Sequence, residues 1–308
     1  MKQVKLNASD RVVGQGQPCY IISEIGINWD GIFPKVFELM KVAKLAGVDA
    51  VKFQKRTPDV STPHVEWERP KETPWGETIP YILYRQKMEF SREQWWAIND
   101  YARSLDLNWF TSVWDVESVN YMEENKLGKE MVAWKVPSAM LTNDALLERL
   151  KKTGGPIFLS TGMSTWTEIQ HAVELIGNTP LVLFHCHSAY PAPVQELHLN
   201  IINSWNTIGA LQNVPIGYSA HETGLATTVA TVALGACAIE RHITLDRSSL
   251  GTDHAASTEG QGFAKLVRDV RAVEKALGEK FTPERQLHNS ELAARTKLRG
   301  IPPTKEGR

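Results

Sequence analysis

Short apolar runs alternate with longer amphipathic stretches along almost the whole chain. The short runs are rich in β-branched and aromatic residues, which is typical of buried strands, whereas the longer stretches have the period of helices that cover a sheet. Strands are expected at residues 19–27, 50–54, 108–112, 131–136, 156–160, 181–185, 214–218 and 237–243. Helices are expected after them at residues 34–46, 92–105, 116–125, 143–153, 165–176, 200–208, 224–234 and 259–277. The alternation predicts consecutive βαβ units and a parallel sheet.

Eight consecutive strand–helix units favour a closed (β/α)8 barrel, the TIM-barrel class of α/β fold, over an open doubly wound sheet. An open sheet usually carries a glycine-rich turn for a dinucleotide after its first strand, but residues 24–31 read EIGINWDG. We expect a catalytic barrel at residues 1–280, followed at residues 281–308 by a short helix, 283–298, and a tail.

Two connections in this pattern are unusual. Residues 55–90 form a long polar insertion with several prolines, and a connection of that length is typical of a functional lid or of a disordered loop. Residues 245–258, LDRSSLGTDHAAST, form a second polar loop after the last strand. Both follow strands at the end of the barrel where the chemistry is expected.

Composition narrows the class of protein. The chain has 308 residues, of which 42% are apolar and 22% charged, as in an ordinary globular protein. The net charge of −1 gives no overall attraction to nucleic acid or to an acidic membrane, so neither is expected as a partner. Three cysteines in so long a chain are not a disulfide framework, which favours a reducing, cytoplasmic location, with Cys186 and Cys237 as packed thiols.

Candidate functional residues lie at the carboxyl ends of the predicted strands, where the active sites of β/α barrels form. Lys52 and Lys135, with neighbouring hydroxyl groups, suit a phosphate or a carboxylate, although each lysine could instead pair with an acid. His221 and His242 follow adjacent strands and suit a divalent metal, although each could instead be structural. The polar residues at the strand ends are Glu24, Asn28, Lys52, Gln54, Thr111, Ser112, Lys135, Ser138, Ser160, Thr161, His185, His187, Ser188, Ser219, His221, Glu240, Arg241 and His242.

Several motifs along the chain resemble those of the sialic acid synthase family. They run in the family's order over residues 15–298, and the last of them is the most specific. The motifs are IISEIGINWDG, AKLAGVDAVKFQK, KMEFS, WKVPS, STGMS, HCHSAYPAP, PIGYSAHETG and ALGACAIERHITLDRSSLGTDHAAS.

This resemblance implies a β/α-barrel enzyme that condenses phosphoenolpyruvate with an N-acetylated hexosamine, such as N-acetylmannosamine, to give a nonulosonic acid and phosphate. It implies a divalent metal, manganese or magnesium, on His221 and His242, and catalytic roles for Glu24, Lys52 and Lys135. Its partners are then two small molecules, phosphoenolpyruvate and an amino sugar. A homodimer is a separate expectation that the resemblance does not carry, because the family dimerises through its antifreeze-like domain. The implied substrate-binding residues are Gln54, Ser112, Ser138, Ser160, Ser188, Tyr190, Ser219 and Asp253.

Three departures from the family pattern fall on the sugar side. Met140 stands where the family usually has an acid, and Trp29 where it usually has a histidine. The chain also ends at Arg308, about where the family's antifreeze-like domain is expected to begin. These departures leave two alternatives open: a phosphoenolpyruvate–aldose condensing enzyme with another acceptor, and a catalytically lapsed barrel that serves as a partner subunit.

Overall fold

The computed structural model describes residues 2–278 and 287–300, and the chain divides into two units, Met1–Glu274 and Lys275–Arg308. In the small unit, helix α11 (Asn289–Arg299) begins after the N-cap His288 and ends at Gly300, which is left-handed. The predicted helix at 283–298 therefore begins outside the described residues, as does the predicted domain boundary at 280/281.

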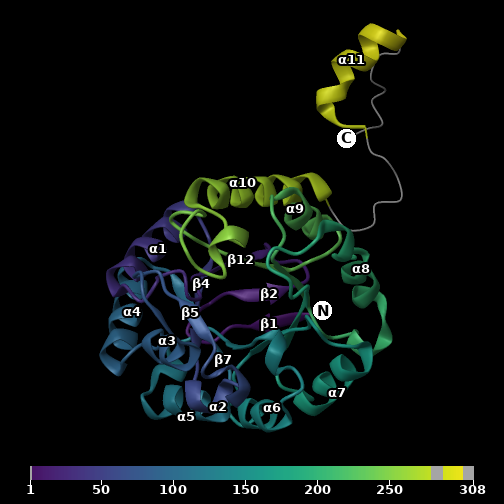
Figure 1. Ribbon diagram of the computed structural model, residues 1–308. Helices are drawn as coiled ribbons and strands as arrows, with labels where there is room; N and C mark the ends of the chain where they lie inside the picture. Colours follow the sequence, from purple (N-terminus) through teal and green to yellow (C-terminus); the bar gives the residue numbers. More distant parts are fainter. Residues whose placement is uncertain (1, 279–286, 301–308) are drawn as a thin grey trace. The chain divides into compact units, whose positions relative to one another are not determined.

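Eight parallel strands form a closed barrel, which confirms the predicted TIM-barrel fold (Figure 1). Each barrel strand pairs with the barrel strands that precede and follow it in the chain, and the last barrel strand, β12, pairs with the first, β3. Strand β8 is shorter than the predicted strand at 131–136: residues 131–133 are buried, but they lie outside the strand. The barrel strands are β3 (Tyr20–Glu24), β4 (Ala50–Lys55), β7 (Asn108–Val113), β8 (Trp134–Val136), β9 (Ile157–Ser160), β10 (Leu181–Cys186), β11 (Ile216–Ala220) and β12 (Ala238–His242).

Helices surround the barrel on its outside (Figure 1). Local signals set their ends: Ser91 and Thr165 each start a helix with a capping box, and Gly47 ends the first one in a left-handed conformation. The helices between and after the strands are α1 (Phe33–Ala46), α4 (Arg92–Ser104), α5 (Val116–Glu124), α6 (Asp144–Lys151), α7 (Trp166–Ile176), α8 (Asn200–Thr207), α9 (Ala226–Ala233) and α10 (Gly260–Leu277). Short 3-10 turns lie at His64–Glu66, Leu127–Lys129, Ser138–Met140, Val194–Glu196, Gly209–Leu211 and His254–Ala256.

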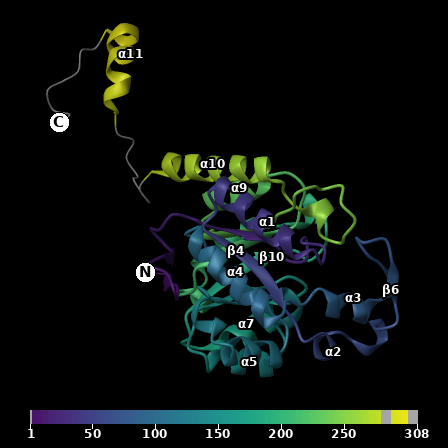
Figure 2. The same ribbon diagram turned by 90° about the vertical axis from the view of Figure 1, so that its left-hand side faces the viewer.

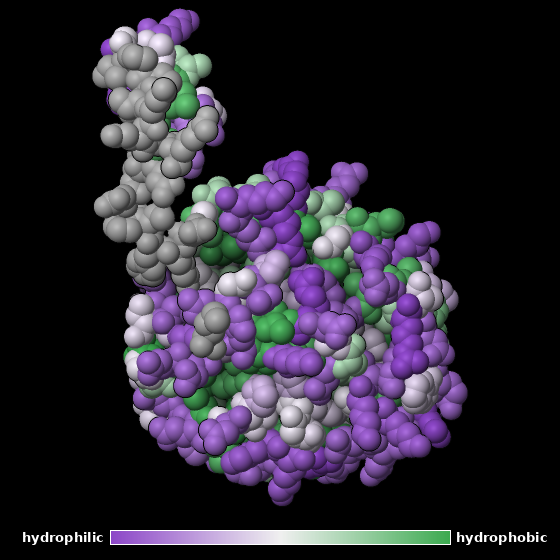
Figure 3. All heavy atoms as spheres, turned by 180° about the vertical axis from the view of Figure 1, so that it is seen from behind, coloured by the Kyte–Doolittle hydropathy of each residue, from purple (hydrophilic) through white to green (hydrophobic). Residues whose placement is uncertain are grey.

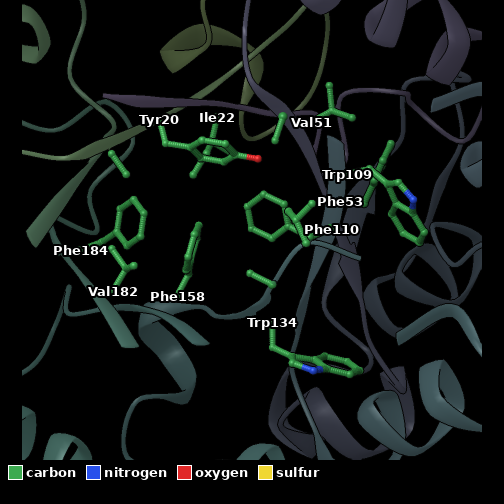
Figure 4. Close-up of a cluster of buried hydrophobic side chains, with 14 of the residues drawn as sticks. Tyr20, Ile22, Val51, Phe53, Trp109, Phe110, Trp134, Phe158, Val182 and Phe184 are labelled. Carbon is green, nitrogen blue, oxygen red and sulfur yellow. The ribbon is translucent and has the colours of Figure 1, made fainter. Parts of the chain in front are cut away.

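The inside of the barrel changes from apolar to polar along its axis. Because side chains alternate between the two faces of a strand, every second residue points inward. Large rings fill the middle of the barrel, where Phe110 meets Phe158 edge to face at 5.5 Å and Phe158 lies 5.4 Å from Phe184 (Figure 4). Nearer the amino end, the hydroxyl of Tyr20 accepts a hydrogen bond from Asn108 at 3.0 Å. The apolar layer forms a floor beneath the polar carboxyl end.

The amino end of the barrel carries an antiparallel hairpin of β1 (Gln3–Lys5) and β2 (Val12–Gly14), which the sequence analysis did not predict. Val4 and Val13 are buried beneath it. Figure 2 shows the hairpin at the opposite end of the barrel from the long insertion, and Figure 3 shows this end as a mainly hydrophilic surface with an apolar patch.

The insertion at residues 55–90 is ordered, so the alternative of a disordered loop is excluded. It contains α2 (Pro58–Ser61), the two-stranded sheet β5 (Pro70–Glu72) and β6 (Thr78–Pro80), and α3 (Tyr81–Lys87). It projects from the carboxyl end of the barrel (Figure 2). None of the helices described is both long and apolar enough to cross a membrane.

Candidate active site

A cavity of about 280 Å³ opens at the carboxyl end of the barrel. Every residue that the sequence analysis assigned to catalysis, substrate binding or metal binding lies on its wall. Those residues are Glu24, Lys52, Gln54, Ser112, Lys135, Ser138, Ser160, Ser188, Tyr190, Ser219, His221, His242 and Asp253. The wall also contains Arg56, Arg85, Trp114, Cys186 and Glu240, to which the sequence analysis gave no role at this site.

The barrel register explains why residues so far apart in sequence meet here. Glu24 is the last residue of β3, and its register partners are Lys52 on β4 and His242 on β12. Gln54 lies two residues beyond Lys52 on the same face of β4 and pairs in register with Ser112 on β7. Parallel strands that end at the same level therefore present their last inward side chains to one space.

An ion-pair cluster lies at the bottom of the cavity. The ammonium of Lys52 lies 2.8 Å from Oε2 of Glu24 and 3.6 Å from Oε1 of Glu240, and all three side chains are buried. Gln54 Nε2 donates to Oε1 of Glu24 at 3.1 Å, and Ser219 donates to Glu240 at 3.2 Å. Glu240 stood among the strand-end residues of the sequence, but its part in this cluster was missed.

Burial and mutual charge shift the pKa values in this cluster. Burial, reinforced by the charge of Glu240, raises the pKa of Glu24 to about 7 despite the opposing effect of Lys52. Burial opposes the charged form of Lys52, but the two carboxylates raise the pKa of its ammonium. Glu240 is also buried, yet Lys52 and Lys135 lower its pKa. A carboxyl group that titrates near neutrality, as Glu24 does, suits a general acid or base.

A second group of polar side chains surrounds Lys135. Its buried ammonium contacts the hydroxyl of Ser160 and lies 3.3 Å from the carbonyl of Val136, and burial lowers its pKa. The backbone N–H of Gly162 donates to Ser138 at 3.0 Å. A Cβ atom at Gly162 would lie only 2.1 Å from the hydroxyl of Ser188, so glycine is required where this loop closes on the cavity. The cluster of cation, hydroxyls and N–H suits a small anion.

The histidine pair lies at the carboxyl ends of β11 and β12. The rings of His221 and His242 are 5.5 Å apart, and the ring of Tyr190 covers His221 at 4.0 Å. Nδ1 of His221 lies 2.6 Å from the carbonyl of His187, which leaves Nε2 free. Nδ1 of His242 is buried without a hydrogen bond and lies 3.4 Å from Oδ2 of Asp253. Burial lowers the pKa of His242 to about 4, so its ring is neutral.

These groups fit a divalent metal in part. A histidine oriented by a backbone carbonyl and a neutral histidine beside a carboxylate are common metal-ligand arrangements. The free atoms are Nε2 of His221, the buried Nδ1 of His242 and the unbonded Oε2 of Glu240. Within the described residues, however, no three His, Cys, Asp or Glu side chains form a ready-made metal cluster. A metal here would need water or substrate to complete its coordination.

Two residues that the sequence analysis placed on the sugar side do not line the cavity. Trp29 is 3% exposed and stacks on Phe90 at 4.6 Å, within the hydrophobic core. Met140 packs against the core at the end of the Ser138–Met140 turn, where its sulfur accepts from Asn143 at 4.0 Å. Cys186, expected to be a packed thiol, is buried but borders the cavity with its sulfur 3.8 Å from Nδ1 of His221.

A closed β/α barrel with lysines, hydroxyls, a carboxyl group of raised pKa and a histidine pair at one mouth is typical of a TIM-barrel enzyme. Residues 39–282 match the model of the NeuB family, and the chain belongs to that family.

Similar proteins agree with this assignment. The N-acetylneuraminate-9-phosphate synthase of Mus musculus is 36% identical over 292 residues, which cover 94% of this chain and 78% of that protein. The N,N'-diacetyllegionaminic acid synthase of Legionella pneumophila is 32% identical over 297 residues, which cover 93% and 80%. The structure of an N-acetylneuraminic acid synthetase from Leptospira borgpetersenii, in complex with citrate, has a TM-score of 0.82 and 26% identity, and covers 96% of this chain and 97% of that one.

The resemblance to sialic acid synthases found in the sequence is thereby confirmed. The chain is an enzyme of the phosphoenolpyruvate-dependent condensing class, which acts on a sugar. The alternative of a catalytically lapsed barrel loses its support. The relatives' names differ in the sugar product, so membership of the family does not identify the acceptor sugar.

Proposed function

We propose that the protein condenses phosphoenolpyruvate with an N-acetylated hexosamine of the N-acetylmannosamine type and with water, and releases a nonulosonic acid and phosphate. The observation that carries the proposal is the meeting of Lys52, Lys135 and Ser160 with Glu24 at one barrel mouth. Cations and hydroxyls there offset the phosphate charge, and the carboxyl group beside them supplies acid–base chemistry.

Different residues of the cavity bind the two substrates in this proposal. Lys135 and the hydroxyls of Ser138, Ser160 and Ser188 hold phosphoenolpyruvate, while Lys52 faces both it and Glu24. Ser112 and Ser219 complete the wall of this inner part, whereas Gln54, Tyr190 and Asp253 face the acceptor sugar. Holding both molecules in one closed space brings the enol carbon to the sugar aldehyde, which is a large part of the catalytic gain.

Glu24 acts after the carbon–carbon bond has formed. The enol carbon of phosphoenolpyruvate attacks the aldehyde carbon of the open-chain sugar, the aldehyde oxygen takes up a proton to become a hydroxyl group, and the adjacent carbon of phosphoenolpyruvate becomes electron-deficient. Water adds to that carbon and Glu24 accepts one of its protons. The carbon–oxygen bond to phosphate then breaks, the added oxygen becomes the keto group, and its remaining proton leaves with the phosphate. A pKa of about 7 lets Glu24 accept this proton near neutrality and return it to solvent afterwards.

A divalent metal, manganese or magnesium, on His221 and His242 belongs to the proposal. Asp253 and Glu240 lie beside the pair and could share the metal through bound water. When bound, such an ion supplies Lewis-acid polarisation of the sugar carbonyl oxygen. The protein's part is to orient the two rings, which the carbonyl of His187 does for His221, while burial keeps His242 neutral.

Calorimetry and product analysis test the proposal. Manganese and phosphoenolpyruvate should each bind, and mass spectrometry should detect a nonulosonic acid when an acceptor is added. His221→Ala should weaken manganese binding by about 10- to 100-fold or more, as loss of a ligand or of its orientation does. His171→Ala is the matched control, because His171 is exposed and pairs with Asp144 on the outside of the barrel. Absence of binding by the wild type, or equal binding by both variants, contradicts the proposal.

The sequence also left open a phosphoenolpyruvate–aldose condensing enzyme with another acceptor, and the same screen tests this alternative. If product forms only with a sugar other than an N-acetylated hexosamine, the proposed reaction of phosphoenolpyruvate is retained and the proposed acceptor is wrong. A homodimer and a cytoplasmic location stay predictions, of which light scattering on the purified protein tests the first.

A further inference from the structure

The outer part of the cavity carries two guanidinium groups that the proposed chemistry does not use. Arg56 follows the last residue of β4, and Arg85 lies on α3 of the insertion. Both line the cavity. Neither belongs to the inner cluster around Lys52, which already has its own carboxylates.

Arg85 is a buried charge without a partner. It is 3% exposed, and within the described residues its guanidinium makes no hydrogen bond and no ion pair, with Nε among the buried atoms that lack a partner. Glu89 lies close by, but its carboxylate binds the ammonium of Lys55 at 2.8 Å and the backbone N–H of Arg56. A buried, unpaired cation is costly unless something else compensates it, and such groups are retained where a ligand supplies the counter-charge.

Arg56 adds a second positive charge at the same place. Its guanidinium lies 3.2 Å from the centre of the Trp114 ring and donates to Oε1 of Gln54 at 3.0 Å, while Nε is buried without a partner. Arg56 and Arg85 line the same cavity, and burial together with the neighbouring charge of Arg85 lowers the pKa of Arg56. Asp253 also lines this part of the cavity, 3.4 Å from Nδ1 of His242, but among the described residues no carboxylate forms an ion pair with either guanidinium.

The position of this pair relative to the inner cluster indicates which part of the substrate it meets. Lys52, Gln54 and Arg56 are successive inward positions along β4, about 7 Å apart at each step of two residues. The aldehyde carbon of the sugar must reach the inner cluster, where phosphoenolpyruvate reacts. The opposite end of the open-chain sugar then lies at the level of Arg56 and Arg85.

We infer that Arg56 and Arg85 bind a phosphate group at the far end of the acceptor, so that the substrate is a 6-phosphorylated N-acetylhexosamine and not the free sugar. The inference rests on the proposed function. Two guanidinium groups with free donors match a dianionic phosphate in charge and in geometry. Relatives are named for products with and without a phosphate, so family membership alone does not choose between them.

Kinetics of the wild type with paired acceptors test the inference. N-acetylmannosamine and N-acetylglucosamine are each supplied free and as the 6-phosphate, with phosphoenolpyruvate and manganese chloride, and the product is measured by mass spectrometry. We expect kcat/KM to be about 10- to 100-fold higher for a phosphorylated sugar, as charge-assisted hydrogen bonds provide. Equal kcat/KM for the two forms overturns the inference and leaves the proposed function intact. Absence of product from every acceptor overturns both.

Variants assign the preference to the two arginines. Arg85→Gln and Arg56→Gln should each lower the ratio of kcat/KM for phosphorylated over free sugar by about tenfold. Lys87→Gln is the matched control, since Lys87 lies on the same helix with an exposed ammonium outside the cavity, and it should leave the ratio unchanged. If the KM for phosphoenolpyruvate rises as much as the KM for the sugar phosphate, the arginines bind phosphoenolpyruvate and the inference is wrong.

A stability measurement separates a ligand-binding role of Arg85 from a structural one. Because its charge has no partner, the ligand-free Arg85→Gln protein should melt at the same temperature as the wild type or higher. Inorganic phosphate should raise the melting temperature of the wild type more than that of the variant. A ligand-free variant that melts several degrees lower, with the same response to phosphate, shows a structural role and overturns the inference.

Discussion

The inner and outer parts of the same cavity differ in whether their buried charges are paired. In the inner part, Lys52 on the barrel strands is matched by Glu24 and Glu240. In the outer part, Arg85 on the insertion has no ion-pair partner within the described residues, and Arg56 beside it has none either. Paired charges compensate one another in the empty protein and hold catalytic groups in place, whereas unpaired ones are compensated when an anion arrives. On our proposals, the strands supply the reaction centre, and the connections after them bind the distal end of the substrate.

The largest effect is expected from breaking the inner pairing. Lys52→Met leaves Glu24 and Glu240 buried without their cation, and removal of one partner from a buried ion pair costs about 3–5 kcal/mol. The free energy of unfolding, measured with urea, should fall by that amount, and turnover should be lost. Equal stability of Lys52→Met and the wild type would remove the contrast with the outer part, where Arg85→Gln is expected to cost nothing.

Glu24→Gln sharpens the comparison by keeping the shape of the inner cluster while removing its base. We expect kcat to fall by about 10²- to 10⁴-fold, the usual contribution of a general base. In the wild type kcat should rise with pH through about 7, because Glu24 must lose its proton to accept one from water and its pKa lies there. The pH profile of kcat checks both points. An unchanged rise near pH 7 in the variant would assign that titration to another group.

A smaller effect is expected from the aromatic support of the outer part. Trp114→Ala removes the ring against which Arg56 lies, and a buried cation–π contact of this kind contributes about 1–2 kcal/mol. The KM for the acceptor should rise by about 5- to 30-fold, while the KM for phosphoenolpyruvate should change far less. Trp114→Phe should recover part of the loss. Equal changes in both KM values would show that the inner and outer parts are not separate.

The smallest effect is expected on the outer surface of the barrel. Arg103 pairs with Glu130, and the arginine side chain is 65% exposed. Exposed ion pairs contribute about 0–1 kcal/mol, so Arg103→Gln should change neither unfolding nor turnover measurably. A clear loss of turnover would mean that charge acts on the cavity over a long range, and that the two parts cannot be compared by local contacts alone.

The barrel was predictable because its signals are local. Each strand is a short apolar run and each helix an amphipathic one, and the residue after the last inward position of a strand falls at the mouth whatever the helices do. Lys52, Lys135, His221 and His242 could therefore be assigned to one cavity from strand ends alone. The hairpin of β1 and β2 was missed because three-residue strands have too little pattern to be detected.

The outer part of the site was less predictable, for a physical reason. Arg56 continues the inward alternation of Lys52 and Gln54, so that pattern could have indicated it. Arg85 carries no such signal, because the path of the insertion depends on how its short helices pack. Trp29 follows the strand-one motif, but its ring turns into the core against Phe90, which a motif comparison cannot reveal.

The apolar floor of the barrel has a kinetic consequence. Phe110, Phe158 and Phe184 close the interior below Lys135, so the cavity is closed on the side of the amino end of the barrel. Whatever binds beside Lys135 must arrive before the sugar covers it, and phosphate set free there must wait until the long product has left. We therefore expect ordered binding, with phosphoenolpyruvate first, and ordered release, with phosphate last, because the proposed phosphoenolpyruvate subsite is the deeper one.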